Sequence, residues 1–213
     1  MLTELAVREY ATRLAAGEPV PGGGSGAALV GALAAALGEM AGNFTTGREK
    51  FAAVEQEVQS VLSVLGRQRR RLLQLTDADA EAYERVGAAY KLPKSTEEEQ
   101  AARRVAIQEA LTAAADVPLA VMEACVNTLA QLEQLRQVAN PNLLSDVAVA
   151  AELSFAALRC AWLNVEVNLA GIEDEAYVSE TRRRIDRQVQ ACETPARMIF
   201  DRIARDIRGG GGG

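Results

Sequence analysis

Residues 54–89, VEQEVQSVLSVLGRQRRRLLQLTDADAEAYERVGAA, decide the fold class of this chain. Side chains seven positions apart form two interleaved, mostly apolar series, which is the pattern of the packed face of a long helix. One series reads Val58, Leu65, Leu72, Asp79 and Val86. An ionised acid on a packed face loses its hydration unless it is paired or hydrogen-bonded, so Asp79 is a candidate functional acid. Asp77 lies about 200° around the helix and points elsewhere.

The rest of the sequence is also helical in character. Hydrophobic residues make up 49% of the 213 residues and aromatic residues only 4%, so Ala, Leu and Val carry the apolar content and favour closely packed helices. No segment alternates convincingly as a strand does. Helices are expected from Thr3 to Gly17, Ser25 to Asn43, Glu49 to Tyr90, Ser95 to Asp116, Pro118 to the break at Asn140, Ser145 to Ala170, and Asp174 to the glycine tail.

These elements predict an all-α fold, a multihelical bundle with one very long helix. A helix of roughly 60 Å is too long for one small globule, so we expect a large bundle or an oligomer. Residues 1–208 are expected to form a single helical domain, followed by a disordered glycine tail at residues 209–213.

Composition excludes several classes of function. The net charge of −6 argues against nucleic-acid binding, and the absence of histidine excludes Ser-His-Asp triads and zinc sites that need a His ligand. We therefore expect no metal. The three cysteines show no CxxC spacing and indicate reduced core thiols in a cytoplasmic protein. No signal peptide is visible, and the most apolar stretch, residues 27–37, is too short to span a membrane.

A glycine-rich loop, Pro21–Ser25, opens the second expected helix. Backbone N–H groups of Gly22, Gly23, Gly24 and Ser25 at a helix N-terminus suit an anion or a polar planar ligand. The loop is not a Walker motif, because no Gly-Lys-Ser/Thr follows, and not a Rossmann fingerprint, because no strand precedes it. The alternative is a flexible connection with a serine cap.

Other polar residues admit both a structural and a functional interpretation. Asp79 is either a proton-transfer group or a core acid paired with a cation from 69–71 or with Arg104. Lys94 and Arg104 either hold an acidic substrate tail or belong to a solvated surface cluster. The remaining candidates are Ser145 and Asp146, which can simply cap a helix, and Asn164 and Asn168, whose inward-facing amides need partners from other helices or a ligand.

Several motifs, taken in order, resemble the cyclodeaminase/cyclohydrolase family, which comprises the cyclodeaminase domain of formiminotransferase-cyclodeaminase and stand-alone methenyltetrahydrofolate cyclohydrolases. They cover nearly the whole chain, and the ordered set is more specific than any one member. The matching segments are Pro21–Ser25, Asp77–Tyr83, Leu92–Lys94, Val117–Leu119, Ser145–Asp146 and Asn164–Leu169.

The resemblance implies an all-α, dimeric, cofactor-free enzyme that acts on tetrahydrofolate one-carbon derivatives. It also implies that Asp79, the second acid of its motif, is catalytic. We expect formiminotetrahydrofolate cyclodeaminase activity with Asp79 as general acid/base, and methenyltetrahydrofolate cyclohydrolase activity at the same site as the alternative. We assign pterin or amidine binding to the Gly22–Ser25 loop, pterin edges to Ser145, Asp146, Asn164 and Asn168, and the glutamate tail to Lys94 and Arg104.

Two readings from other classes stay open. A non-catalytic helical dimer that binds folate or a protein predicts unchanged behaviour when Asp79 is replaced. A structural scaffold of long helices predicts no folate affinity.

Overall fold

The helix α3 (Glu55–Tyr90) is unbroken, as the seven-residue pattern predicts. In this computed structural model, which describes residues 1–209, it spans 36 residues, or about 54 Å. Val58, Leu65 and Leu72 are fully buried along it. The stretch before it, Glu49–Val54, forms the 3₁₀ helix η2, so the α-helix begins later than expected.

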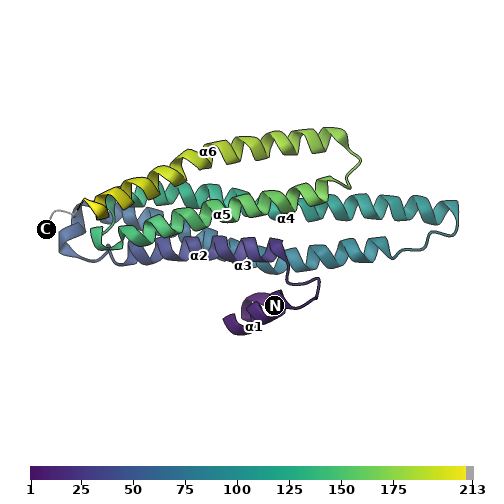
Figure 1. Ribbon diagram of the computed structural model, residues 1–213, viewed down its shortest axis with the longest axis horizontal. Coiled ribbons are helices and arrows are strands. Elements are labelled where there is room, and N and C mark those ends of the chain that lie inside the picture. Colours follow the sequence, from purple (N-terminus) through teal and green to yellow (C-terminus); the bar gives the residue numbers. More distant parts are fainter. Residues whose placement is uncertain (210–213) are drawn as a thin grey trace.

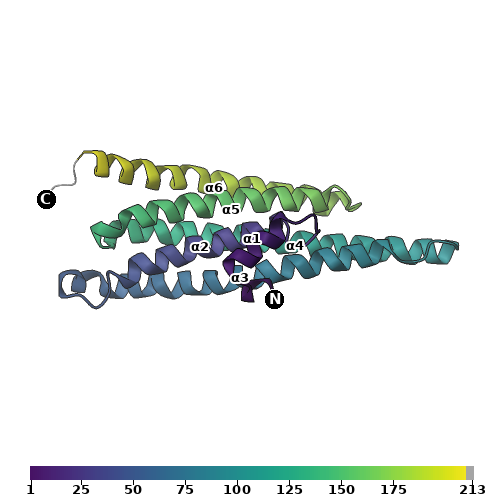
Figure 2. The ribbon, with the colours of Figure 1, turned by 60° about the horizontal axis from the view of Figure 1, so that its bottom comes forward.

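The remaining helices give an elongated bundle, and residues 1–209 contain no strand, which confirms the all-α class (Figures 1 and 2). Helices α2, α3, α4 and α5 pack as a four-helix core, and α6 lies on α4 and α5. Beyond the core, the α3–α4 hairpin extends as an arm, and α1 projects from the side of the bundle (Figure 1). The elements other than α3 are α1 (Val7–Ala15), α2 (Gly23–Asn43), α4 (Glu97–Val138), α5 (Leu144–Leu169), α6 (Glu175–Arg208), η1 (Leu2–Glu4) and η3 (Pro141–Leu143).

Small residues let α2 approach its neighbours closely, as its Ala/Gly-rich sequence predicts. A Cβ atom added to Gly38 would lie 2.8 Å from a methyl carbon of Leu132 and 2.9 Å from one of Leu65. Both distances are below ordinary carbon contact, so these leucines occupy the space that a side chain would need. This packing fixes α2 against α3 and α4.

The prediction of a helix break before Pro118 is wrong, because α4 continues through Pro118. Proline lacks the N–H that would bond the carbonyl of Ala114, four residues earlier. In the folded chain the side-chain amide of Asn168 on α5 donates to that carbonyl at 3.4 Å. The hydrogen bond that proline removes is thus replaced from another helix, and one long helix stands where two were expected.

The C-terminal region agrees largely with expectation. Asp174 caps α6 by accepting a hydrogen bond from the backbone N–H of Tyr177. The helix includes Pro195 and changes direction along its length (Figure 1). Gly209 ends it, and the other residues of the predicted glycine tail, 210–213, lie outside the described residues.

Two expectations from composition need revision. Cys160 is exposed, whereas Cys125 and Cys192 are buried as predicted. Helices α2 and α4 are both long and apolar enough to cross a membrane by composition, so the apolar stretch is longer than expected. Both helices pack within the bundle, and such core helices meet the same criterion of length and apolarity.

Candidate active site

Asp79 is half-buried on α3 and receives one backbone hydrogen bond. Its Oδ2 accepts the N–H of Ser25, in the first turn of α2, at 2.8 Å. Burial raises the pKa of the Asp79 carboxyl above its ordinary value, and the Ser25 hydrogen bond opposes that rise. The alternative of a core acid paired with a nearby arginine is not supported, because Arg69 pairs with Glu39 instead. Among residues 1–209, Asp79 has no ion-pair partner.

Gly24 permits the contact between α2 and Asp79. A Cβ atom on Gly24 would lie 2.0 Å from Oδ1 of Asp79, so no side chain fits there without displacing the carboxylate. The loop before it ends at Gly22, the N-cap of α2, whose N–H donates to the Ser25 hydroxyl at 3.2 Å. The Ser25 hydroxyl donates in turn to the Gly22 carbonyl at 3.0 Å. This turn aims the Ser25 N–H at Asp79.

Asp79 faces a cavity of about 360 Å³ between the N-terminal loop, α2, α3, α4 and α5. Six residues predicted for the site from sequence line it together: Gly22, Gly23, Gly24, Asp79, Asn164 and Asn168. Ser25 is fully buried behind them and supports the turn. The structure therefore brings together the loop, the acid and the two amides.

Part of the cavity wall was not predicted from the sequence. Tyr83 and Val86 lie one and two turns after Asp79 on α3, so their helical spacing was a usable signal. Leu111 and Ala114 come from α4, and no local pattern places them beside Asp79. The remaining lining residues are Pro19, Val20, Ala82 and Val167.

The two asparagine amides are held by backbone carbonyls. Nδ2 of Asn164 donates to the carbonyl of Cys160 at 2.8 Å, and Nδ2 of Asn168 donates to the carbonyl of Asn164 at 3.0 Å and to that of Ala114. The side-chain oxygens accept no hydrogen bond from residues 1–209, so they can receive donors from a ligand. Their predicted inward orientation is thus partly explained by helix contacts.

Lys94 and Arg104 lie in a second cavity of about 510 Å³, together with Tyr90 and Arg103. Tyr90 is one turn beyond Val86 on α3, so this cavity lies farther along the α3–α4 arm than the first. Arg104 makes a forked contact with Glu173, which raises the pKa of its guanidinium. Arg103 lies over the Tyr90 ring at 5.6 Å from its centre.

Ser145 and Asp146 do not line the Asp79 cavity of the same chain. Within one chain, the prediction that they share a site with Asn164 and Asn168 is therefore wrong. Ser145 is exposed in the first turn of α5, and Leu143 occupies the N-cap without a side-chain cap hydrogen bond. Asn164 follows nineteen residues later, which is about 28 Å along the helix. Proximity in a motif set did not imply proximity in space.

This site and fold have counterparts among known proteins. The sequence model of the formiminotransferase-cyclodeaminase family matches residues 6–187. Methenyltetrahydrofolate cyclohydrolase of Methylorubrum extorquens is 41% identical over 201 residues, covering 94% of this chain and 97% of that protein. Formimidoyltransferase-cyclodeaminase of Rattus norvegicus is 35% identical over 199 residues, covering 93% of this chain but only 37% of the rat protein.

A solved structure also matches along the whole length. The crystal structure of formiminotetrahydrofolate cyclodeaminase from Thermotoga maritima superposes with a TM-score of 0.80 at 32% identity, covering 98% of each chain. The resemblance noted in the sequence motifs is confirmed by these similarities. The chain belongs to the formiminotransferase-cyclodeaminase family of enzymes.

Proposed function

We propose that this chain hydrolyses 5,10-methenyltetrahydrofolate to 10-formyltetrahydrofolate, with Asp79 as general base and acid. The observation that carries the chemistry is Asp79 itself, a half-buried carboxylate with one backbone donor and no cationic partner among residues 1–209. Burial raises the pKa of this carboxyl, which makes it a stronger base than an exposed aspartate and lets it take up and release a proton in turn. The choice of reaction rests on the cyclohydrolase relative, which is 41% identical and coextensive with this chain.

Hydrolysis requires one proton to pass from the attacking water to the nitrogen at position 5 and a second proton to be released to solvent. Asp79 accepts a proton from water as its oxygen attacks the cationic methenyl carbon, and the carboxylate also stabilises that carbon by its charge. The protonated acid then delivers this proton to the nitrogen at position 5 as its bond to carbon breaks. The hydroxyl of the intermediate loses its proton to solvent and becomes the formyl carbonyl. These steps transfer only protons and call on no redox cofactor or metal.

Cyclodeamination of 5-formiminotetrahydrofolate, the reaction that the sequence analysis placed first, remains the second candidate. It is favoured by the match to the Thermotoga maritima cyclodeaminase over 98% of both chains. The nitrogen at position 10 attacks the carbon of the protonated formimino group (–CH=NH2+) and loses its proton to Asp79, which leaves an amine on that carbon. The protonated Asp79 then delivers a proton to the departing nitrogen, which leaves as ammonia.

The two cavities suit the two ends of such a substrate. The first, at about 360 Å³, is at the small end of ligand pockets, so we assign it the bicyclic ring and the one-carbon group. The side-chain oxygens of Asn164 and Asn168 would accept hydrogen bonds from ring N–H groups. The second cavity, with Lys94, Arg103 and Arg104, would receive the glutamate carboxylates. Leu111 lies seven positions beyond Arg104 on α4, which is about 10 Å.

A parallel assay tests this proposal against its rivals. The purified chain is mixed with 5,10-methenyltetrahydrofolate in one cuvette and 5-formiminotetrahydrofolate in another, and the methenyl absorbance is followed. Faster decay than buffer in the first supports hydrolysis, whereas growth in the second supports cyclodeamination. Asp79→Asn should abolish either signal while leaving the helical circular dichroism unchanged.

Silence in both cuvettes would overturn the enzymatic proposal and favour the non-catalytic folate- or protein-binding dimer or, without folate affinity, the scaffold. Wild-type turnover by Asp79→Asn would overturn the mechanism alone. A homodimer and a cytoplasmic location are part of the same proposal, and sedimentation velocity tests the first.

A further inference from the structure

Asp77, two residues before Asp79 on α3, holds a different part of the chain. Its Oδ2 accepts a hydrogen bond from the Thr3 hydroxyl at 2.7 Å, and its Oδ1 accepts from the backbone N–H of Thr3 at 3.3 Å and from that of Leu2. The carboxylate thus caps the N-terminus of η1, where unpaired N–H groups favour a negative charge. The prediction that the first helix begins at Thr3 is wrong, because α1 begins at Val7.

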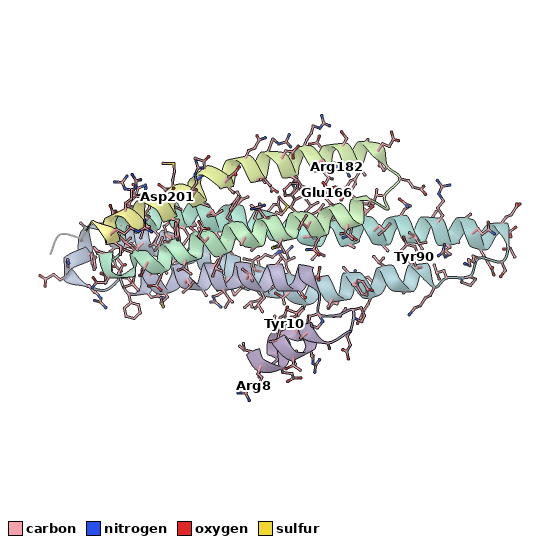
Figure 3. The ribbon with its side chains drawn as sticks, in the orientation of Figure 1. Arg8, Tyr10, Tyr90, Glu166, Arg182 and Asp201 are labelled. Atoms are coloured by element: carbon pink, nitrogen blue, oxygen red, sulfur yellow. The ribbon has the colours of Figure 1, made fainter. Side chains whose placement is uncertain are left out.

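The N-terminal strap, residues 1–22, is therefore held by α3 at both ends. Asp77 holds its beginning, and Asp79 holds Ser25 just after its end. Between these ends, Tyr10 is the only buried side chain of α1, and its hydroxyl donates to the Ser25 hydroxyl at 3.4 Å. Figure 3 shows Tyr10 on the side of α1 that faces the bundle and Arg8 on the outer side.

The strap contributes directly to the cavity of Asp79. Pro19 and Val20 line that cavity, and they also line a neighbouring cavity of about 540 Å³ against Tyr83 of α3. Apart from Tyr10, no residue of α1 is buried, and the other buried residue of the strap is Pro21, next to its end. Few apolar contacts hold α1 itself, so the polar contacts at the two ends of the strap and at Tyr10 contribute to its retention.

We propose that Asp77 is a positioning residue of the Asp79 site. By clasping η1 onto α3, it keeps Pro19 and Val20 in place as a cavity wall and, through Tyr10, keeps Ser25 over Asp79. The expected effect of Asp77 on turnover rests on the proposed function, whereas its expected effect on the strap does not. Asp77 does not touch the reacting atoms, and its effect passes through the strap.

The hydrogen bonds of Asp77 to Leu2 and Thr3 form a clasp between α3 and η1. Two substitutions break this clasp from opposite sides. Asp77→Ala removes the acceptor, and Thr3→Val removes one donor with little change in shape. Because the hydrogen bonds are charge-assisted, Asp77→Ala should raise the rate of tryptic cleavage after Arg8 and Arg13 by about tenfold or more, and Thr3→Val by less. The two effects should not add in the double variant, because both break one contact.

Substrate kinetics provide the functional readout. Asp77→Ala should lower kcat/KM by about tenfold, through both KM and kcat, since the wall and the Ser25 donor are both affected. Asp77→Asn keeps one acceptor oxygen and should recover part of the loss. Thr12→Val and Glu81→Ala are matched controls. Within residues 1–209 the Thr12 hydroxyl bonds only the Arg8 carbonyl, and Glu81, an exposed acid of α3, pairs only with Arg85. Both should behave as wild type in cleavage and turnover.

The clasp is also visible without substrate, in the titration of the Asp79 carboxyl followed by carbon NMR. Losing the Ser25 hydrogen bond removes the one contact that lowers the pKa, so the Asp79 pKa should rise in Asp77→Ala. In the Asp79 cavity the only other ionisable side chain among residues 1–209 is Tyr83 of α3, since α2, α4 and α5 contribute Gly, Leu, Ala, Val and Asn.

The outcomes separate the two proposals. Faster cleavage without loss of turnover, or loss of turnover without faster cleavage, would overturn the positioning role, because the strap would not be the link. If wild type turns over neither folate, the proposed function fails. The cleavage rates and the Asp79 titration then decide the clasp: wild-type values in Asp77→Ala overturn it, and shifts in both sustain it.

Discussion

The side-chain amide of Asn168 on α5 donates to the backbone carbonyl of Ala114 on α4, the carbonyl that Pro118 leaves without its helical partner. Both residues line the cavity of Asp79. A structural repair of α4 therefore lies in the wall of the candidate active site. The same contact fixes where the Asn168 side-chain oxygen points, so helix continuity and ligand recognition share one side chain.

Replacing Asn168 tests this repair. Asn168→Ala should destabilise the fold by about 1 kcal/mol, because the Ala114 carbonyl loses a partner at a partly buried position. Pro118→Ala restores the helical N–H, so the same Asn168→Ala change should have a smaller effect in that background. Urea unfolding of the four proteins measures the coupling. Equal effects of Asn168→Ala in both backgrounds would contradict the repair.

Gly24 should tolerate no side chain, whereas a neighbouring glycine should. A Cβ on Gly24 would lie 2.0 Å from Asp79 Oδ1, but a Cβ on Gly26 meets nothing within 4 Å. We expect Gly24→Ala to reduce kcat by about 100-fold or more, because the carboxylate must move by an ångström or so. Gly26→Ala is the matched control and should keep turnover and gain a little helix stability. Equal activity of the two variants would refute the geometry.

The pH dependence of turnover should report the raised pKa of Asp79. As a general base, Asp79 is active when ionised, so kcat/KM should fall as the pH drops through its pKa. Because burial raises that pKa, the acidic limb should lie above the pKa of about 3.9 expected of an exposed aspartate. A pH series in buffers of constant ionic strength measures this limb. A limb at or below the ordinary aspartate value would argue against Asp79 as the titrating group.

Stability should respond to the same group with a defined sign. A carboxyl whose pKa is raised on folding binds its proton more tightly in the folded state, so its contribution favours folding at low pH. That contribution is lost as the pH rises from the unfolded pKa through the folded one. The Asp79→Asn side chain does not ionise, so the variant avoids this loss of stability as the pH rises. Its amide oxygen can still accept the Ser25 N–H. Relative to wild type, it should gain stability between acidic and neutral pH, as thermal unfolding at several pH values will measure.

The second cavity should discriminate folates by their tails. Arg103→Ala should raise KM for a polyglutamylated substrate several-fold and change KM for the monoglutamate less, with an effect that shrinks in high salt. Arg183→Ala on α6 is a matched control, since that exposed arginine pairs with the exposed Glu180 of its own helix. Parallel shifts of KM for both substrates would place the tail elsewhere.

Much of the fold follows from local sequence. The seven-residue series identifies α3 and places Asp79 on its inner side, because helical periodicity depends only on spacing along the chain. The glycine and alanine content of α2 likewise predicts close helix contacts, which Gly38 makes with Leu65 and Leu132. Pro118 misled the prediction, since local rules count the missing N–H but not a donor that arrives from α5.

The site was recoverable only in part. Asp79 and the Gly22–Gly24 turn were identified, but their direct contact was not, because Ser25 is 54 residues from Asp79 along the chain. Ser145 and Asp146 were grouped with the asparagines of the same helix, although about 28 Å of α5 separates them. Asp77 was set aside because it faces away from Asp79, yet that direction is what lets it meet Thr3.

By itself the sequence determined the helical class, the long α3, the place of Asp79 on the inner side of α3 and the family motifs, all of which follow from residue type and periodic spacing. Only the tertiary structure decided that α4 runs through Pro118, that Gly24 touches Asp79, and that Asp77 clasps the N-terminal strap. Each of these depends on two helices, or a helix and a loop, meeting at one point. The packing of the whole bundle sets these contacts, because residues far apart in the sequence interact only where the bundle brings them within hydrogen-bonding distance.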